Sequence, residues 1–449
     1  MSLFGKETPS NRADGRMAGV GGRAWRAEIN DQDQRFAKRF GRIRERIWPG
    51  LQLAIAIFHR MPCGFCVPVD RRRVGIYESA MDLTTTAYGT WSAGRFMHFG
   101  ETLSEERFIE CIEQAWKAGM RTFVTADVYG NGKADELLGQ ALEKYPRDEY
   151  CLVGMLGHDF YEGQRQGSRG YPRFTELHDA GHYRDYLRTA CERSLVRCKT
   201  DHFDLLMLHN PDEIGLTSEA VWDGLRALKK EGLADRLGVA PGPANGFTLD
   251  IINCIEKFGA DIDWAMLILN PLEPWPSCHV LPVCEKHDVK VLTRVADYGG
   301  LFHGDMKEGH EFKPGDHRAY RAEGWVEHGL AKIEKMKPIA EKHGLSLIQF
   351  AAAWNLSQPA VESVVPTFIQ EAGESARLID EQIKDFAATP ELRLSVEECE
   401  QIREIGDNTG CMTLKGASKR HEVSERPDEW PMRADLLELA GRHGLGTEW

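Results

Sequence analysis

The sequence lacks a hydrophobic run long enough to span a membrane. Its longest apolar stretch, residues 51–58, is LQLAIAIF, well short of the roughly 20 residues that a spanning helix needs. It also lacks an excess of positive charge, because 69 Asp and Glu outnumber 56 Lys and Arg and give a net charge of −13. A chain this acidic is expected to bind neither nucleic acid nor an anionic membrane. The expected partner is a small molecule, and the sequence does not indicate an oligomeric state.

The sequence gives little sign of disulfide or metal chemistry. Its eleven cysteines are scattered, mostly within expected helices and strands, which indicates reduced thiols in a cytoplasmic protein. Cys63 and Cys66 form a CxxC pair, but no second pair follows at the spacing of a zinc site. His303, His310 and His317 are seven residues apart, which fits no compact ligand motif. We therefore expect no bound metal.

The first 80 residues differ in charge from the rest of the chain. They contain 15 Lys and Arg against 8 Asp and Glu, are interrupted by Gly and Pro, and show no sustained periodicity. Three interpretations compete: a disordered basic arm, a targeting peptide, or sequence upstream of the native start. Acidic residues such as Glu7 and Asp14 count against a transit peptide. The expected organisation is an atypical extension over 1–80, one domain over 81–410 and a tail over 411–449.

Residues 121–141 have the pattern of one strand, one tight turn and the start of one helix. Residues 122–125 are β-branched or aromatic, as a buried strand prefers. Asn131 and Gly132 form a turn dipeptide, and apolar side chains then recur three and four apart, as on a helix face. Tyr129 therefore lies in the loop at the carboxyl end of the strand.

Strand and helix patterns alternate from residue 81 to residue 366. Eight such repeats predict a closed parallel (β/α)8 TIM barrel, in which chemistry belongs at the carboxyl ends of the strands. The expected strands are 83–88, 122–125, 150–155, 203–209, 237–239, 264–269, 289–293 and 361–366. The expected helices lie within 102–118 and over 133–141, 183–198, 218–230, 248–258, 325–343 and 347–356.

Two connections are longer than a minimal barrel needs. Residues 156–182 and 299–324 are polar and rich in glycine, and each follows the carboxyl end of a strand. Long loops of this kind are either functional or mobile surface. Both alternatives stay open, and in either case enlarged loops are expected to rim the carboxyl face.

The segment FVTADVYGNGKADELLGQAL, residues 123–142, resembles the motif FDTADxYGxGxSEELLGxAL of the aldo-keto reductase family. Similar landmarks are DLLMLHNPD at 204–212, KKEGLADRLGVA at 229–240 and the segment 340–366. The resemblance covers about 81–407. Its abrupt beginning favours the interpretation that residues 1–80 precede the native start. It implies a reductase that transfers hydride from a reduced nicotinamide cofactor to a carbonyl.

The resemblance implies four catalytic residues, of which this chain keeps half. Tyr129 matches the tyrosine that donates a proton, and His209 matches the histidine that orients or polarises the carbonyl. The family aspartate falls on Val124 and the family lysine on Met155, so the pair that lowers the phenol pKa is replaced by apolar side chains. We therefore expect the pKa of Tyr129 to stay near its ordinary value of about 10.

The segment after the eighth strand also departs from the family. There the family has PGxR or PGxK, whose cation grips the 2′-phosphate of NADP, whereas Pro366 is followed by TFIQ. The expected cofactor is NADP or NAD without strong preference, and the binding of any dinucleotide is open. The resemblance implies Asn270, Arg294 and Thr367 as cofactor-binding residues. Arg377, further along, is expected to be a surface helix residue.

Other polar residues near expected strand ends are possible substitutes for the missing pair. His158 and Asp159 follow the position of the lost lysine, and Asp297 follows the seventh strand. Beside a phenol, such groups could abstract a proton next to a carbonyl, although residues of this kind are more often structural. Trp91 and Tyr298 are expected to bind substrate.

Three hypotheses follow. The first is a divergent aldo-keto-reductase-like oxidoreductase acting on a small polar carbonyl or sugar. The second is a lyase or isomerase that uses Tyr129, His209 and loop carboxylates without external hydride. The third is a non-catalytic barrel that binds a ligand. Binding of a nicotinamide cofactor separates the first from the other two.

Overall fold

The computed structural model describes residues 81–165, 171–177, 179–242, 250–373, 376–406, 408, 438 and 441–442. The expected extension over 1–80, with its CxxC pair, lies outside the described residues. So does the expected tail over 411–449, except for three of its residues. Within the described part, no helix is both long enough and apolar enough to cross a membrane.

Eight parallel strands form one sheet in sequence order from β1 to β8. The first and last strands meet through a parallel bridge between Thr86 and Val364, and the amide of Val364 donates to the carbonyl of Thr85 at 2.9 Å. The predicted (β/α)8 barrel is confirmed. The strands are β1 (Ala87–Gly89), β2 (Thr122–Val124), β3 (Cys151–Leu156), β4 (Leu205–His209), β5 (Leu237–Ala240), β6 (Trp264–Ile268), β7 (Lys290–Arg294) and β8 (Val361–Val365).

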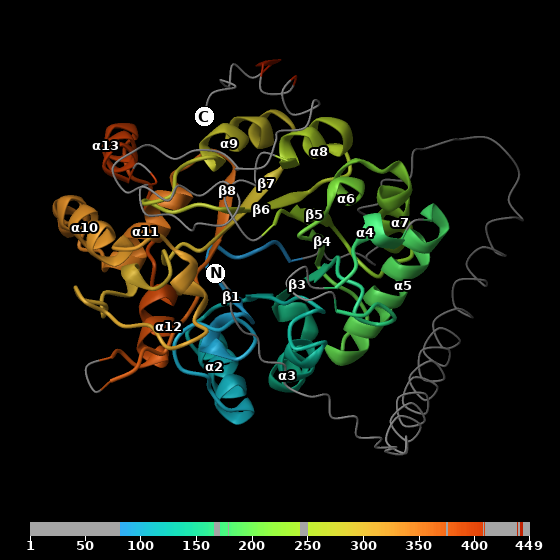
Figure 1. Cartoon of the computed structure of the whole chain (residues 1–449), viewed down its shortest axis with the longest axis horizontal. Helices are drawn as coiled ribbons and strands as arrows, with labels where there is room; N and C mark the ends of the chain where they lie inside the picture. Colours follow the sequence, from blue (N-terminus) through green and yellow to red (C-terminus); the bar gives the residue numbers. More distant parts are fainter. Residues whose placement is uncertain are drawn as a thin grey trace, which may run out of the picture. The chain divides into compact units, whose positions relative to one another are not determined.

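Helices surround the strands (Figure 1). Each expected helix that is described is present within a few residues of its expected bounds. The helices are α2 (Glu105–Lys117), α3 (Lys133–Leu142), α4 (Phe174–Leu177), α5 (Ala180–Arg197), α6 (Glu213–Thr217), α7 (Glu219–Lys230), α8 (Asp250–Phe258), α9 (Ser277–Lys286), α10 (Trp325–Lys342), α11 (Leu347–Leu356), α12 (Ile379–Ala387) and α13 (Val396–Gly406).

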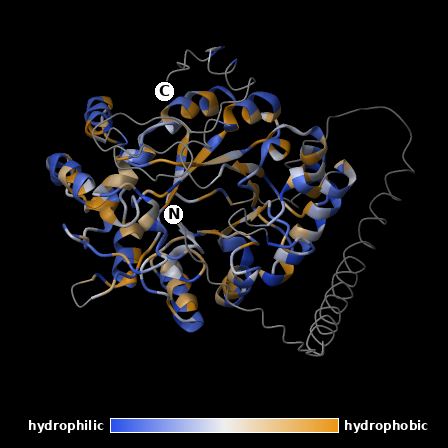
Figure 2. Cartoon of the chain, in the orientation of Figure 1, coloured by the Kyte–Doolittle hydropathy of each residue, from blue (hydrophilic) through white to orange (hydrophobic). Residues whose placement is uncertain are grey.

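The two-residue period of the strands separates two hydrophobic cores. One core lies between the sheet and the helices, where alternate strand residues such as Phe123 and Leu152 pack against apolar helix faces. The other lies inside the barrel and includes Val124, Met155 and Met207. Figure 2 shows hydrophobic residues along the central strands and mixed character on the surrounding helices. The interior of the barrel is therefore filled with side chains, and space for a ligand lies only beyond the ends of the strands.

The first strand is shorter than the sequence predicts. Only residues 87–89 form the ladder, because the threonines before them are engaged otherwise. The amide of Thr84 donates to the hydroxyl of Thr122 at 2.7 Å, and the carbonyl of Thr84 accepts from Ser363. Helices α4, α6, α9, α12 and α13 are not among the helices whose bounds the sequence predicts. In α9, Pro282 inside the helix obscures the helical pattern.

Candidate active site

A cavity of about 290 Å³ opens at the carboxyl end of the strands. The residues that line it come from strands β6 and β7 and from the loops that follow β1, β2, β7 and β8. They are Trp91, Met97, Phe99, Tyr129, Met266, Arg294, Val295, Gly299, His317, Arg318, Arg321, Thr367 and Ile369. Known small-molecule sites span about 300–1,000 Å³, so this cavity suits a small ligand or one end of a larger one.

Tyr129 lies at the wall of this cavity, where the loop after β2 carries it. Its ring packs against the core inside the barrel and meets the rings of Trp91 and His209 edge-on, at centroid distances of 6.4 and 5.5 Å. Its hydroxyl forms no hydrogen bond with a described residue, and the cavity is the space that it can reach. The hydroxyl is therefore open to a ligand.

The two apolar replacements explain the electrostatics of Tyr129. Val124 and Met155 are fully buried in the core inside the barrel, at the positions that the resemblance gives to the aspartate and lysine. No ammonium then offsets the loss of water around the phenol. Burial raises the pKa of Tyr129 to about 12, and the nearby guanidinium of Arg294 lowers it only in part. The expectation of an ordinary pKa near 10 is wrong, because it left out burial.

His209 is the last residue of β4 and follows Met207 on the inward side of that strand. Its ring faces His158 edge-on at 5.2 Å, and the side chain of Asn210 lies 3.5 Å from Nε2 of His158. Burial lowers the pKa of His158 to about 4 and that of His209 well below the ordinary value. Both rings are neutral near pH 7. The structure thus brings Tyr129, His209 and His158 together.

Arg294 ends β7 on the inward side, two residues after Leu292 of the core inside the barrel. Nη2 donates to the carbonyl of Pro241 at 3.0 Å and to that of Gly242. Nε is buried without a hydrogen-bond partner. Among the described residues no carboxylate pairs with this guanidinium, and burial lowers its pKa while Tyr129 raises it.

Two further arginines reach the cavity from the long loop 299–324, and both are neutralised. Arg318 donates to Asp316 at 2.8 Å and to Glu371 at 3.1 Å, and all three side chains are almost fully buried. Arg321 pairs with Glu273 at 3.3 Å. This loop, which also supplies Gly299 and His317, is therefore part of the cavity wall.

Three predicted site residues serve as supports for loops. The carboxylate of Asp297 accepts the amides of Thr367 and Gly300, at 2.7 and 2.9 Å, and burial raises its pKa. The carboxylate of Asp159 accepts the amides of residues 161 and 162 in its own loop. The side-chain amide of Asn270 donates to Glu273 at 2.8 Å and to the carbonyl of Val295 at 3.0 Å. None of these three lines the cavity.

The two residues predicted to bind substrate have different positions. Trp91 lines the cavity, and its indole N–H donates to the hydroxyl of Thr367 at 3.1 Å. Tyr298 is buried behind the wall, where its ring meets Trp325 at 5.6 Å and lies under the guanidinium of Arg321 at 4.1 Å. The structure thus brings Trp91, but not Tyr298, to the cavity.

The loop after β8 shows how well a dinucleotide would fit. The amides of Thr367, Phe368 and Ile369 donate to Asp297, Ser92 and Gln382 at 2.7, 3.0 and 3.1 Å, so none is free to bind a phosphate. Arg377 is bound to Asp385 and to the carbonyl of His303, and it is about one-third exposed. The expectation that Arg377 is a surface helix residue is wrong in detail, because it precedes α12 and ties two loops together.

The cavity itself suits a nicotinamide ring. Its apolar walls, such as Trp91, Met266 and Ile369, can flank a flat ring, and the hydroxyl of Tyr129 is unpaired among the described residues. The described residues therefore fit the nicotinamide end of the cofactor, whereas the amides of residues 367–369 supply no phosphate site.

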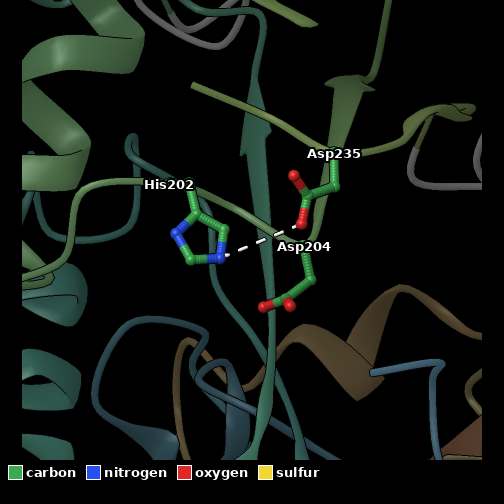
Figure 3. A group of neighbouring side chains, drawn as sticks. All are labelled: His202, Asp204 and Asp235. Atoms are coloured by element: carbon green, nitrogen blue, oxygen red, sulfur yellow. Dashed lines mark ion pairs between the residues drawn. The ribbon is translucent and has the colours of Figure 1, made fainter. Parts of the chain in front are cut away.

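A separate polar group lies at the amino ends of β4 and β5. His202, Asp204 and Asp235 have ligand atoms within 4.8 Å of one another (Figure 3). His202 and Asp235 are 3.9 Å apart, but Asp204 already accepts from Arg147 at 2.7 Å and from the amide of Leu152 at 2.6 Å. These bonds account for the group as a structural one.

Sequence reasoning missed much of the cavity wall. Arg318, Arg321, Met97 and Phe99 lie in long connections without a strong period, and their contacts come from distant chain segments. One signal in the sequence is that the 299–324 loop contains both Arg and Asp residues. Residues that can pair in this way indicate an ordered loop. His317, expected to be a scattered loop histidine, also lines the cavity.

Comparison with known proteins agrees with this architecture. The model of the aldo/keto reductase family matches residues 86–407. Versiconal hemiacetal acetate reductase of Aspergillus parasiticus is 26% identical over 346 residues, which cover 73% of this chain and 94% of that protein. NADH-specific methylglyoxal reductase of Escherichia coli is 24% identical over 348 residues, covering 75% and 98%. The solved glycerol dehydrogenase of Gluconobacter oxydans superposes with a TM-score of 0.57 at 25% identity, covering 73% and 93%. The chain belongs to the aldo/keto reductase family.

Proposed function

We propose that this protein is a cytoplasmic oxidoreductase that interconverts a small polar carbonyl and its alcohol with a nicotinamide cofactor. One observation carries the proposal: the Tyr129 hydroxyl opens onto a small cavity, makes no hydrogen bond with a described residue, and has His209 and Arg294 beside it. Relatives named as reductases support the redox class. The free, mostly buried thiols of the described cysteines suit a reducing compartment.

The residues of this chain would act on the carbonyl oxygen. A bound reduced nicotinamide supplies the hydride to the carbonyl carbon. Tyr129 gives its phenolic proton to the oxygen and is then reprotonated from solvent. Neutral His209 does not line the cavity, but its ring contacts that of Tyr129, so it would orient the phenol that donates to the carbonyl oxygen.

Arg294 takes over part of the role of the missing lysine. With a pKa of about 12, Tyr129 is a weaker acid than an ordinary phenol. Its pKa would be higher still without Arg294, whose positive charge favours the phenolate and offsets part of the effect of burial. The Val124 and Met155 replacements therefore favour slow turnover of generic aldehydes. Walls such as Trp91 and Met266 exclude water from the reacting atoms.

A second function, a lyase or isomerase without external hydride, is favoured by one observation. The amides of residues 367–369, directly after β8, are all engaged with protein side chains, so these three amides offer no phosphate site. Such an enzyme would use Tyr129 and His209 for proton transfer alone.

Cofactor binding separates the two. We expect NADH or NADPH to quench the tryptophan fluorescence of the full-length protein, because Trp91 lines the cavity. The same titration of a Trp91→Phe variant should show less quenching at equal affinity. If neither nucleotide binds at millimolar concentration, the oxidoreductase is ruled out, and the lyase or isomerase and the non-catalytic barrel remain.

A further inference from the structure

We infer that the cavity binds a small carboxylate, which Arg294 holds while the rest of the molecule points toward Tyr129. The inference names the substrate class of the proposed function and rests on that function only for the fate of the carbonyl. The ligand is a short monocarboxylic acid that carries a carbonyl group close to its carboxylate.

The first support is charge. Three arginines line the cavity, and two have carboxylate partners: Arg318 with Asp316 and Glu371, and Arg321 with Glu273. Arg294 has none among the described residues. Removing a guanidinium from water is costly unless an anion compensates it. The cavity therefore has one uncompensated positive charge, which a monoanion would balance.

The second support is the set of donors on Arg294. Its hydrogen bonds to Pro241 and Gly242 both leave from Nη2, and Nε is buried, whereas Nη1 is not fully buried and has no hydrogen bond to a described residue. Because a guanidinium presents its N–H groups in a fixed fork, the two carbonyls fix the plane of the group and leave other donors for a ligand. A carboxylate has the matching planar geometry.

The third support is the shape of the cavity. Its volume of about 290 Å³ is small, and Met97, Met266 and Ile369 contribute apolar walls. A dianion or a large polar sugar would leave unpaired polar groups against these walls. A short acid can place its carboxylate on Arg294 and its carbonyl near the unpaired hydroxyl of Tyr129.

The test compares an acid with its neutral analogue. Binding of a short 2-oxo monocarboxylate and of its primary amide to the full-length protein is measured by calorimetry, with and without NADH. We expect the acid to bind about ten- to hundredfold more tightly, as a charge-assisted contact provides. This comparison needs no variant, so it holds even if Arg294 proves necessary for folding. Equal affinity for acid and amide would overturn the inference.

Variants locate the contact. Arg294→Gln should remove the preference for the acid, and Arg294→Lys should restore part of it. Lys307→Gln is the control, since it removes one exposed positive charge from the long loop 299–324, at a residue that does not line the cavity. Unchanged acid binding by Arg294→Gln would also overturn the inference. If the acid binds but is not turned over, the result counts against the proposed function alone. If neutral aldehydes are turned over rapidly and the acid is not preferred, the result counts against this inference alone.

Discussion

Two partly buried arginines of this barrel, Arg197 and Arg294, have opposite surroundings. Arg197 donates to the fully buried carboxylate of Asp135 at 3.1 Å and to the hydroxyl of Tyr161 at 2.9 Å. Burial alone would lower its pKa, but Asp135 and Tyr161 raise it well above the ordinary value. Arg294 has no described carboxylate partner, and burial lowers its pKa.

The difference shows which polar groups hold the fold together and which are open to a ligand. Around Arg197, the carboxylate of Asp135 also accepts hydroxyls from Thr125 and Ser194 at 2.8 and 2.7 Å. The carboxylate of Asp135 is thus satisfied by groups of the protein itself. Around Arg294, Nη1 and the hydroxyl of Tyr129 have no partner among the described residues and are not fully buried, so this region is open to a ligand.

The largest expected effect is a loss of stability when the network around Arg197 and Asp135, called the closed network below, is broken. Asp135→Ala leaves Arg197 as an uncompensated buried charge, and we expect the free energy of unfolding to fall by about 3–5 kcal/mol. Urea denaturation followed by circular dichroism measures the loss. Glu143→Ala is the control, because its pair with Lys199 is exposed and worth less than about 1 kcal/mol. Equal losses in the two variants would contradict the distinction between the two regions.

The next effect is a loss of activity in the open region, the part of the cavity wall around Arg294 and Tyr129. Tyr129→Phe removes a hydroxyl that has no described partner, so we expect nearly unchanged melting and a roughly 100-fold or larger loss of turnover. Tyr161→Phe is the matched variant in the closed network. Its hydroxyl binds Asp127 at 3.0 Å as well as Arg197, so it should lose stability and keep turnover once folded. Full activity of Tyr129→Phe would remove the central residue of both candidate functions.

The histidines of the open region predict a pH dependence of stability. His158 has a pKa of about 4 when folded against 6.5 in the unfolded chain, so the unfolded chain binds more protons between these values. The contribution of His158 to the free energy of unfolding is fully present above pH 6.5. It should fall as the pH drops toward 4, by up to about 3 kcal/mol. Thermal melts of the protein and of His158→Gln across this range measure the difference. Parallel pH profiles would show that His158 is not the cause.

The fold was predictable because period and turn chemistry are local. The alternation in β2 and the turn at Asn131, which adopts a φ of 54°, give the strand–turn–helix around Tyr129 directly. By contrast, α9 contains Pro282, and a proline inside a helix weakens every local signal for it.

The site was predictable only in part, for a physical reason. Tyr129 and His209 could be placed from strand ends and the family motif, and the structure brings their rings to 5.5 Å. Asp297 supports loops through its contact with Thr367, 70 residues away in the chain. The surroundings of Arg294 depend in the same way on Pro241, 53 residues away. Charge compensation is a property of three-dimensional neighbours, and one sequence does not contain it.

The smallest expected effect concerns cofactor choice, and it tests whether Arg377 stays paired with Asp385. Because Arg377 is bound to Asp385 at 3.1 Å and the amides after β8 are engaged, no described cation there is free for a 2′-phosphate. NADP(H) and NAD(H) should therefore bind within about tenfold of each other, since a charge-assisted phosphate contact is worth roughly 1.5–3 kcal/mol. Titrations of both nucleotides at equal ionic strength measure the ratio, and Arg377→Gln should leave it unchanged. A clear preference for NADP(H) that Arg377→Gln abolishes would mean that Arg377 exchanges Asp385 for phosphate, and the loop after β8 would then belong with the open region.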